Sequence, residues 1–324
     1  MTQPYSSFTG MPQDGRPRDY VISRDDALTV DLAIRLGRPL LIEGEAGCGK
    51  TRLADAVSRE LGLKNAPIIV PVRSSTRAND LFYRFDALRR LQDSNIAMLR
   101  DRASHVHNYV TLEPVGRAIV SGEPRVVLID EVDKADMDFQ NDLLFALERF
   151  QFVIDEIPAE EAALAKTERD LSPVMSWPGG TRPIVMFTSN REKQLPKPFL
   201  RRCIYLELKF PADPNELVEI VTANLRRRRE TGEPGAETLG ELNNQLVIRA
   251  VQSFLAIRKT AEIDSATKKP ATAELLDWIH ALHFYPDSTD GLDTLTPPFW
   301  RLLFRSAEDI SRHARHAGRK ANPA

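Results

Sequence analysis

The sequence predicts an α/β fold with a mostly parallel sheet, followed by a smaller all-helical domain. Five short apolar runs lie in the first two thirds of the chain, and helical patterns separate several of them, which is the arrangement of a parallel sheet with helices on both faces. Beyond about residue 210, only helical patterns remain. The 324 residues are 42% hydrophobic and 28% charged, which is enough apolar material for more than one core.

Each apolar run is short and bounded by glycine, proline or polar residues, as buried strands are. Between them, residues 50–62 place apolar side chains at helical spacing and close with a glycine, and residues 138–150 show the same spacing. The predicted strands are residues 39–44, 66–72, 125–130, 182–190 and 202–210.

A domain boundary is predicted near residue 211, because residues 210–216 combine two prolines with two acids and read as a turn. We expect a flexible tail at 1–19, an α/β core at 20–210 and a helical domain at 211–324, with a loop at 230–240 inside it.

Charge and cysteine content restrict the class of protein. A formal net charge of −2 gives no general reason to expect nucleic acid binding. Cys48 and Cys203 lie in unlike contexts, so a disulfide framework is implausible and a cytoplasmic location is expected. The first residues lack the pattern of a signal peptide, and no apolar stretch predicts a membrane span.

The stretch GEAGCGKT at residues 44–51 has the spacing of a phosphate-binding loop between a strand and a helix. Its glycines permit a tight turn, and the N-terminus of the next helix favours an anion. Lys50 is expected to reach the β and γ phosphates, and Thr51 to ligate Mg²⁺. The residues assigned to nucleotide binding here are Gly44, Glu45, Ala46, Gly47, Cys48, Gly49, Lys50, Thr51 and Arg52.

Two further predicted strands end in polar residues. Asp130 and Glu131 follow the run VVLI, and Asn190 ends IVMFTSN. Ligands of α/β sheets bind at the carboxyl ends of strands. We therefore expect Asp130 to hold Mg²⁺, Glu131 to polarise the water that attacks the γ phosphate, and Asn190 to help hold that water. A kinase has less use for the second acid.

Arg201 and Arg202 precede the last predicted strand. A guanidinium can neutralise charge that develops on a γ phosphate during cleavage. If these arginines point away from their own domain, they would serve the nucleotide of a neighbouring subunit.

The order of these motifs, with a helical domain after them, resembles AAA+ ATPases, and among them the MoxR branch of the helix-2-insert clade. Residues 75–91 resemble the insert of that branch, and residues 141–156 resemble its third core helix leading into a hairpin before sensor 1. The resemblance covers roughly residues 20–315.

This resemblance implies a P-loop NTPase fold of the AAA+ type: an αβα core with a five-stranded parallel sheet and a smaller all-helical lid. It also implies a ring, usually a hexamer. Asn190 matches sensor 1, and Arg202 best matches the arginine finger, although the neighbouring Arg201 leaves that choice open. Lys268 and Lys269 are the candidates for sensor 2.

The implied activity is Mg²⁺-dependent ATP hydrolysis that remodels a partner protein, with ATP and ADP as cofactors. The family commonly works with proteins that carry a von Willebrand factor A domain. A nucleic-acid-directed AAA+ motor and a non-hydrolysing nucleotide switch are the alternatives, and a small-molecule kinase fits least well.

Two features are left open by the sequence. Residues 155–180 are longer than the usual hairpin, charged and partly helical in pattern, and serve either as a surface insertion or as a partner-specific element. His105 and His107 share a spacing that fits one strand face, but no paired acid or cysteine cluster accompanies them, so no metal site is predicted there.

Overall fold

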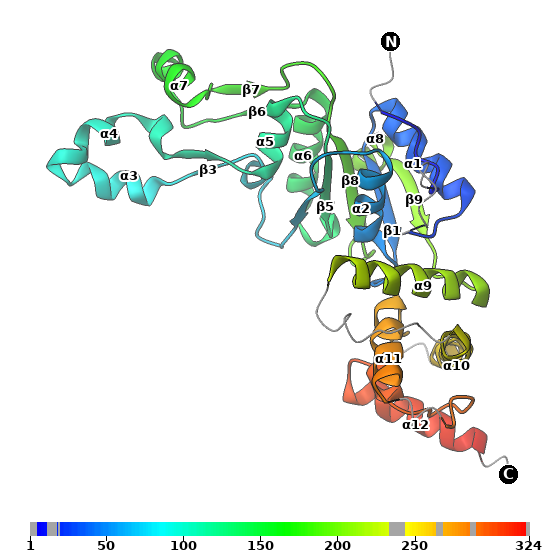
Figure 1. Ribbon diagram of the computed structural model, residues 1–324. Coiled ribbons are helices and arrows are strands. Elements are labelled where there is room, and N and C mark those ends of the chain that lie inside the picture. The colour runs from blue at the N-terminus through cyan, green and yellow to red at the C-terminus, as the bar shows by residue number, and fades with distance from the viewer. Residues whose placement is uncertain are drawn as a thin grey trace. The chain divides into compact units, whose positions relative to one another are not determined.

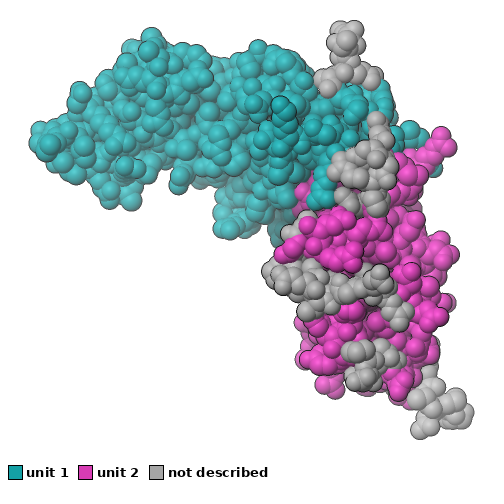
Figure 2. Space-filling model, in the orientation of Figure 1, with its two compact units in different colours: residues 1–9, 25–43, 57–207 teal, residues 10–24, 44–56, 208–324 magenta. Residues whose placement is uncertain are grey.

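The chain divides into two compact units, each with a hydrophobic core of its own (Figure 2). Unit 1 comprises residues 1–9, 25–43 and 57–207, and unit 2 comprises residues 10–24, 44–56 and 208–324. The computed structural model describes residues 5–11, 18, 20–232, 244–263, 268–285 and 290–321.

A five-stranded sheet has the order β2-β5-β8-β1-β9 (Figure 1). All five predicted strands are confirmed, with shifts of at most two residues at their ends. The pairs β2–β5, β5–β8 and β1–β8 are parallel. The strands are β1 (Leu40–Gly44), β2 (Ile68–Pro71), β5 (Val126–Asp130), β8 (Ile184–Ser189) and β9 (Ile204–Leu208).

The register of the sheet aligns the carboxyl ends of its central strands. Glu43 on β1 pairs with Ser189 on β8, and Ile129 on β5 pairs with Phe187. The residues that follow these positions therefore come together at one edge. Every residue of β8 is buried, as a central parallel strand requires.

The helices of the α/β part follow the predicted spacing. In α6, the carboxylate of Asp136 accepts a 2.9 Å hydrogen bond from the N–H of Phe139 and fixes the first turn. Phe139, Leu143 and Leu147 then form a buried face at intervals of four residues. These helices are α1 (Arg24–Leu36), α2 (Lys50–Glu60), α5 (Pro114–Ser121), α6 (Met137–Arg149) and α8 (Lys197–Arg202).

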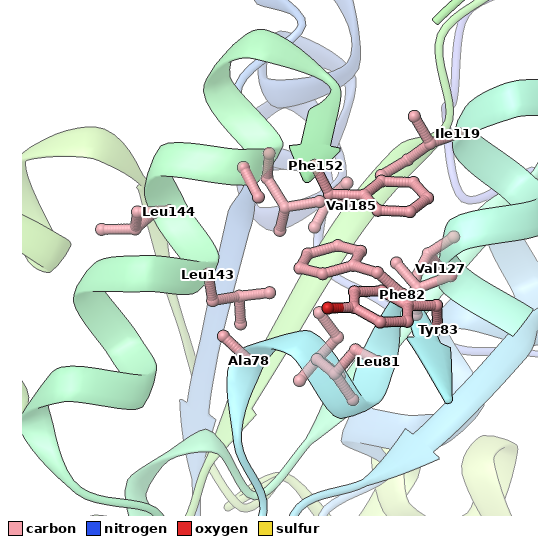
Figure 3. Close-up of a cluster of buried hydrophobic side chains, with 14 of the residues drawn as sticks. Ala78, Leu81, Phe82, Tyr83, Ile119, Val127, Leu143, Leu144, Phe152 and Val185 are labelled. Atoms are coloured by element: carbon pink, nitrogen blue, oxygen red, sulfur yellow. The ribbon is translucent and has the colours of Figure 1, made fainter. Parts of the chain in front are cut away.

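Two short antiparallel strand pairs extend from unit 1 (Figure 1). Phe82, just before one pair, stacks on Phe152 of the other with ring centroids 5.1 Å apart, in the cluster of Figure 3. The expected helix within 155–180 is present as α7. The elements are η1 (Ala78–Leu81), β3 (Tyr83–Phe85), α3 (Ala87–Ser94), η2 (Ala97–Leu99), α4 (Arg100–Ser104), η3 (Val106–Tyr109), β4 (Val110–Leu112), η4 (Val132–Lys134), β6 (Gln151–Val153), η5 (Ala159–Glu161), α7 (Ala162–Arg169) and β7 (Val174–Ser176).

Unit 2 contains helices packed around a core that includes the fully buried Leu217, Phe254 and Trp278. Residues 297–314, one of the helical patterns beyond residue 210, are divided into a 3-10 turn and a separate helix. No helix in the described part of the chain is long and apolar enough to cross a membrane. The elements are α9 (Pro214–Thr231), α10 (Asn244–Ile263), α11 (Thr272–Phe284), η7 (Trp300–Leu303) and α12 (Ala307–Ala321).

Parts of two predicted segments fall outside the described residues. These are residues 1–4, 12–17 and 19 of the expected tail, and most of the expected loop at 230–240. Within the tail, Phe8 is buried, and its N–H donates a 2.9 Å hydrogen bond to the carboxylate of Asp31. The predicted limits of the tail and of the two domains stay predictions.

Candidate functional site

The glycine-rich loop lies between the end of β1 and the start of α2. Gly47 has a φ of 80° and Gly49 a φ of 95°, both in the region that favours glycine. A Cβ atom on Gly47 would also lie 2.9 Å from the Cβ of Ala271, closer than real side chains approach. Backbone conformation and space therefore both require glycine at Gly47.

Lys50, at the first position of α2, is only 7% exposed. Its ammonium donates hydrogen bonds to the carbonyl oxygens of Gly44 at 2.8 Å and Glu45 at 2.9 Å. A buried ammonium needs such partners. Thr51 follows on the same turn and is half-buried, with its hydroxyl as a candidate ligand for a cation.

A residue that sequence reasoning missed also contacts this loop within unit 2. Arg258 on α10 forms an ion pair with Glu45, although its own side chain is only 6% exposed. The two lysines predicted as sensor 2, Lys268 and Lys269, are both exposed. An arginine inside a helix gives no motif in the sequence, so nothing in the pattern of α10 singled it out.

In unit 1, Asp130 and Glu131 are linked through the hydroxyl of Thr188 on β8. This hydroxyl donates to Oδ1 of Asp130 and accepts a 2.8 Å hydrogen bond from the N–H of Glu131. Thr188 is fully buried. Sequence reasoning missed it, and the available signal was a hydroxyl residue at the end of an otherwise apolar run.

Glu131 is held from two sides. The side-chain amide of Asn190 donates a 2.9 Å hydrogen bond to Oε1 of Glu131, and the ammonium of Lys134 pairs with Oε2. Glu131 has a φ of 59°, a left-handed conformation that is uncommon for a residue with a side chain and that clusters at functional sites. The structure thus brings together the three strand-end residues that the sequence singled out.

Arg191 fixes the backbone directly after Asn190. Its guanidinium bonds to Glu43 at 2.8 Å and to Glu207 at 2.7 Å, and it also contacts the hydroxyl of Tyr205. It joins the ends of β1, β8 and β9. Arg191 therefore positions the turn from which the Asn190 amide reaches Glu131.

The two arginines of the expected finger end the helix α8, and both are exposed. Arg202 pairs with Glu148 of α6, with about half of each side chain in solvent. The side chain of Arg201 makes no hydrogen bond or ion pair within the part of the chain that the structure describes. Arg38 bonds to the backbone carbonyl oxygens of both residues and so fixes the helix end.

The strand-end residues suit a hard cation. Asp130 offers a carboxylate, and oxygen donors of this type are those that Mg²⁺ prefers. Asp130 is half-buried rather than sealed in the core. The residues present therefore fit Mg²⁺ as the resident ion.

Residues 39–203 match the AAA domain of the dynein-related subfamily. The matched segment is just over half of the chain and contains the phosphate-binding loop, Asp130, Glu131 and Asn190. The chain belongs to this AAA family. AAA domains bind nucleotide, usually with Mg²⁺, and in general hydrolyse it.

Among solved structures, the closed state of Hsp104 with ATPγS and FITC casein is similar to this AAA protein over 82% of the chain, at 16% identity and a TM-score of 0.46. The chain covers 44% of the length of that protein. Among curated proteins, no sequence matches.

Proposed function

We propose that this AAA protein is a Mg²⁺-dependent ATPase of the MoxR type, which couples ATP hydrolysis to the remodelling of a partner protein. The observation that carries the proposal is the contact between Asn190 and Glu131. It supplies the two polar groups that a hydrolase needs to hold and polarise a water molecule, next to Asp130 as a cation ligand.

Each residue has a distinct role in this proposal. Lys50 binds the β and γ phosphates. These phosphates replace the backbone carbonyl oxygens to which its ammonium donates in the present structure. Asp130 and Thr51 hold Mg²⁺, which when bound neutralises phosphate charge. Glu131 accepts the proton of the attacking water, and Asn190 orients that water.

Lys134 is one of two residues that hold the carboxylate of Glu131. In the described structure the carboxylate is divided between the Lys134 ammonium and the Asn190 amide. Release of Lys134 would free Oε2 of Glu131 to contact the attacking water when ATP is bound.

The proposal includes assembly into a homo-oligomeric ring, usually a hexamer in this group. Arg201 and Arg202 support it, because they are exposed at the end of α8 rather than buried toward their own domain. A guanidinium at such a place is available to a neighbouring subunit.

The proposed client is a protein with a von Willebrand factor A domain. The resemblance of the motif order and of residues 75–91 to the MoxR branch supports this step. The net charge of −2 agrees with a protein client rather than nucleic acid.

The test compares the wild type with Glu131→Gln and Asn190→Ala in a Mg²⁺-dependent phosphate-release assay. Glu131→Gln should bind MgATP with near-normal affinity but hydrolyse it at least about 100-fold more slowly, since general base catalysis contributes on the order of 10²–10⁴ in rate. Glu160→Gln removes an exposed acid elsewhere and is the matched control.

Three results would redirect the proposal. Normal turnover by Glu131→Gln would place the base elsewhere. Stimulation of hydrolysis by DNA or RNA, with no response to a von Willebrand factor A domain, would favour a nucleic-acid motor. Tight ATP binding without measurable hydrolysis by the wild-type protein would indicate a switch.

A further inference from the structure

His107 is buried at the junction of two segments of unit 1 that are far apart in the sequence. Its ring is fully buried, with a carboxylate at each of its two nitrogen atoms. Nδ1 contacts Glu161, at the end of η5, and Nε2 lies 2.9 Å from Glu168 on α7. These acids are 54 and 61 residues away in the sequence, which is why the local sequence did not reveal them as partners of the histidine.

A second histidine completes the cluster. The rings of His105 and His107 have centroids 5.6 Å apart. One ligand atom from each of His105, His107 and Glu161 lies within 4.8 Å of the others, close enough for a single cation to reach all three. The set contains two imidazoles and one carboxylate, which are ligands that suit Zn²⁺.

Each ring nitrogen of His107 faces a carboxylate. A neutral imidazole has one N–H donor and one acceptor nitrogen, so it can donate to only one of two carboxylates. A cation beside Nδ1 and Glu161 would use the acceptor nitrogen, while Nε2–H donates to Glu168. A metal-bound histidine commonly donates its other N–H to a carboxylate in this way.

The surroundings of Glu161 also favour a cation. Its side chain is only 9% exposed. One of its carboxylate oxygens, Oε1, accepts a 3.1 Å hydrogen bond from the backbone N–H of His107, which holds the carboxylate against the histidine.

We propose that His105, His107 and Glu161 form a Zn²⁺ site, with Glu168 as the carboxylate that orients His107. The site joins the segment η3, which leads into β4, to η5 and α7 of the 155–180 insertion. The bound ion would fix that insertion against η3, so it is a structural site separate from the residues assigned to ATP.

The experiment uses the full chain, without a histidine tag, after treatment with EDTA and dialysis into excess Mg²⁺. Isothermal titration with Zn²⁺ should show one site per chain. A thermal unfolding scan should show a higher melting temperature when Zn²⁺ is bound. Co²⁺, used as a coloured substitute, should give visible absorption bands that Zn²⁺ then displaces.

Four variants locate the site. His105→Ala and Glu161→Gln should abolish the absorption bands and the Zn²⁺-dependent rise in melting temperature. Glu168→Gln should weaken Zn²⁺ binding on the order of 10–100-fold, as expected for loss of a carboxylate that orients a ligand. Glu160→Gln, which changes the exposed neighbour of Glu161, should bind Zn²⁺ as the wild type does.

Two results would overturn the proposal. One is an absence of Zn²⁺ binding by the wild-type chain in excess Mg²⁺, which would identify the cluster as a protonated His107 held between two carboxylates. The other is equal Zn²⁺ binding by wild type, His105→Ala and Glu161→Gln, which would place the ion elsewhere. Because His105 is only partly buried and Glu168 is exposed, their variants keep the test valid even if Glu161→Gln prevents folding.

Discussion

Arg258 on α10 forms an ion pair with Glu45 in the phosphate-binding loop. The same guanidinium lies over the ring of Phe210, 3.8 Å from its centroid, and donates to the backbone carbonyl of Pro270, two residues before α11. This side chain on α10 thus links the loop to Phe210 and Pro270, which lie before α9 and α11. We therefore predict that Arg258 senses nucleotide binding at the loop, and Lys268 and Lys269 stay predicted candidates for sensor 2.

Arg258→Ala should destabilise unit 2 and weaken the response of the helical part to ATP. The carbonyl of Pro270 would lose its buried donor, a loss that costs about 1–3 kcal/mol of unfolding free energy. Since nearly half of Glu45 is exposed, the ion pair itself adds little to that figure. Chemical denaturation with and without MgATP measures both effects.

Arg249→Ala provides a matched control on the same helix. Arg249 pairs with Asp293 at 3.3 Å, and both side chains are largely exposed. Its loss should change the unfolding free energy by less than about 1 kcal/mol. If Arg258→Ala behaves like Arg249→Ala in its unfolding free energy and in its response to MgATP, Arg258 does not couple the loop to the helical part of unit 2.

Lys50→Ala should abolish or severely weaken ATP binding, because the γ phosphate loses its main cation. Calorimetric titration with MgATP measures the affinity, and Lys64→Ala, which removes an exposed lysine beyond α2, is the control. Unchanged affinity in Lys50→Ala would contradict the assignment of the loop.

The sheet was predictable because buried parallel strands appear in the sequence as short, continuous apolar runs. Runs such as VVLI are apolar on both faces, and the polar residues Asp130 and Asn190 mark where strands end. The end of the chain was harder to predict. Residues 297–314 carry a continuous helical pattern, yet the structure divides them between η7 and α12, with Phe304 buried between the two elements.

The candidate site was predictable only where local sequence determines the chemistry. The glycines, Lys50 and the strand-end acids belong to short motifs whose spacing has physical meaning. Thr188, Arg191 and Arg258 act through partners on other elements, and such pairings depend on tertiary register. The acids around His107 were missed for the same reason.

Cys48 offers a chemical test of the loop. Burial raises the pKa of its thiol, although Lys50 acts in the opposite direction, and burial raises the pKa of Cys203 to about 12. The thiolate is the reactive form, so alkylation of both should be slow at neutral pH and accelerate as pH rises, with Cys48 reacting first.

MgATP should protect Cys48 from alkylation, because nucleotide would cover the loop that contains it. Mass spectrometry after treatment with iodoacetamide follows both thiols, and the buried Cys203 serves as an internal control for unfolding. Equal modification of Cys48 with and without MgATP, at a nucleotide concentration that saturates binding, would show that the nucleotide does not cover this loop.

The last prediction concerns Arg202, with Arg201 as the alternative. An arginine that acts on a neighbouring subunit must be exposed in the single chain, and both side chains are. Arg202 is held only by a half-exposed ion pair with Glu148, which is worth at most about 1 kcal/mol and is readily exchanged for a phosphate. We expect Arg202→Ala to lower the hydrolysis rate on the order of 10³–10⁵-fold, the range of other arginine fingers, and to leave ATP affinity nearly intact.

Mixing two inactive variants tests whether the arginine acts between subunits. Arg202→Ala supplies an intact phosphate loop, and Lys50→Ala supplies an intact arginine, so a mixed ring contains some complete sites. Partial recovery of ATPase activity on mixing would support action in trans, and repeating the experiment with Arg201→Ala decides between the two arginines. Co-assembly without recovery, together with full activity of a monomeric wild-type chain, would show that each subunit cleaves ATP with its own residues alone.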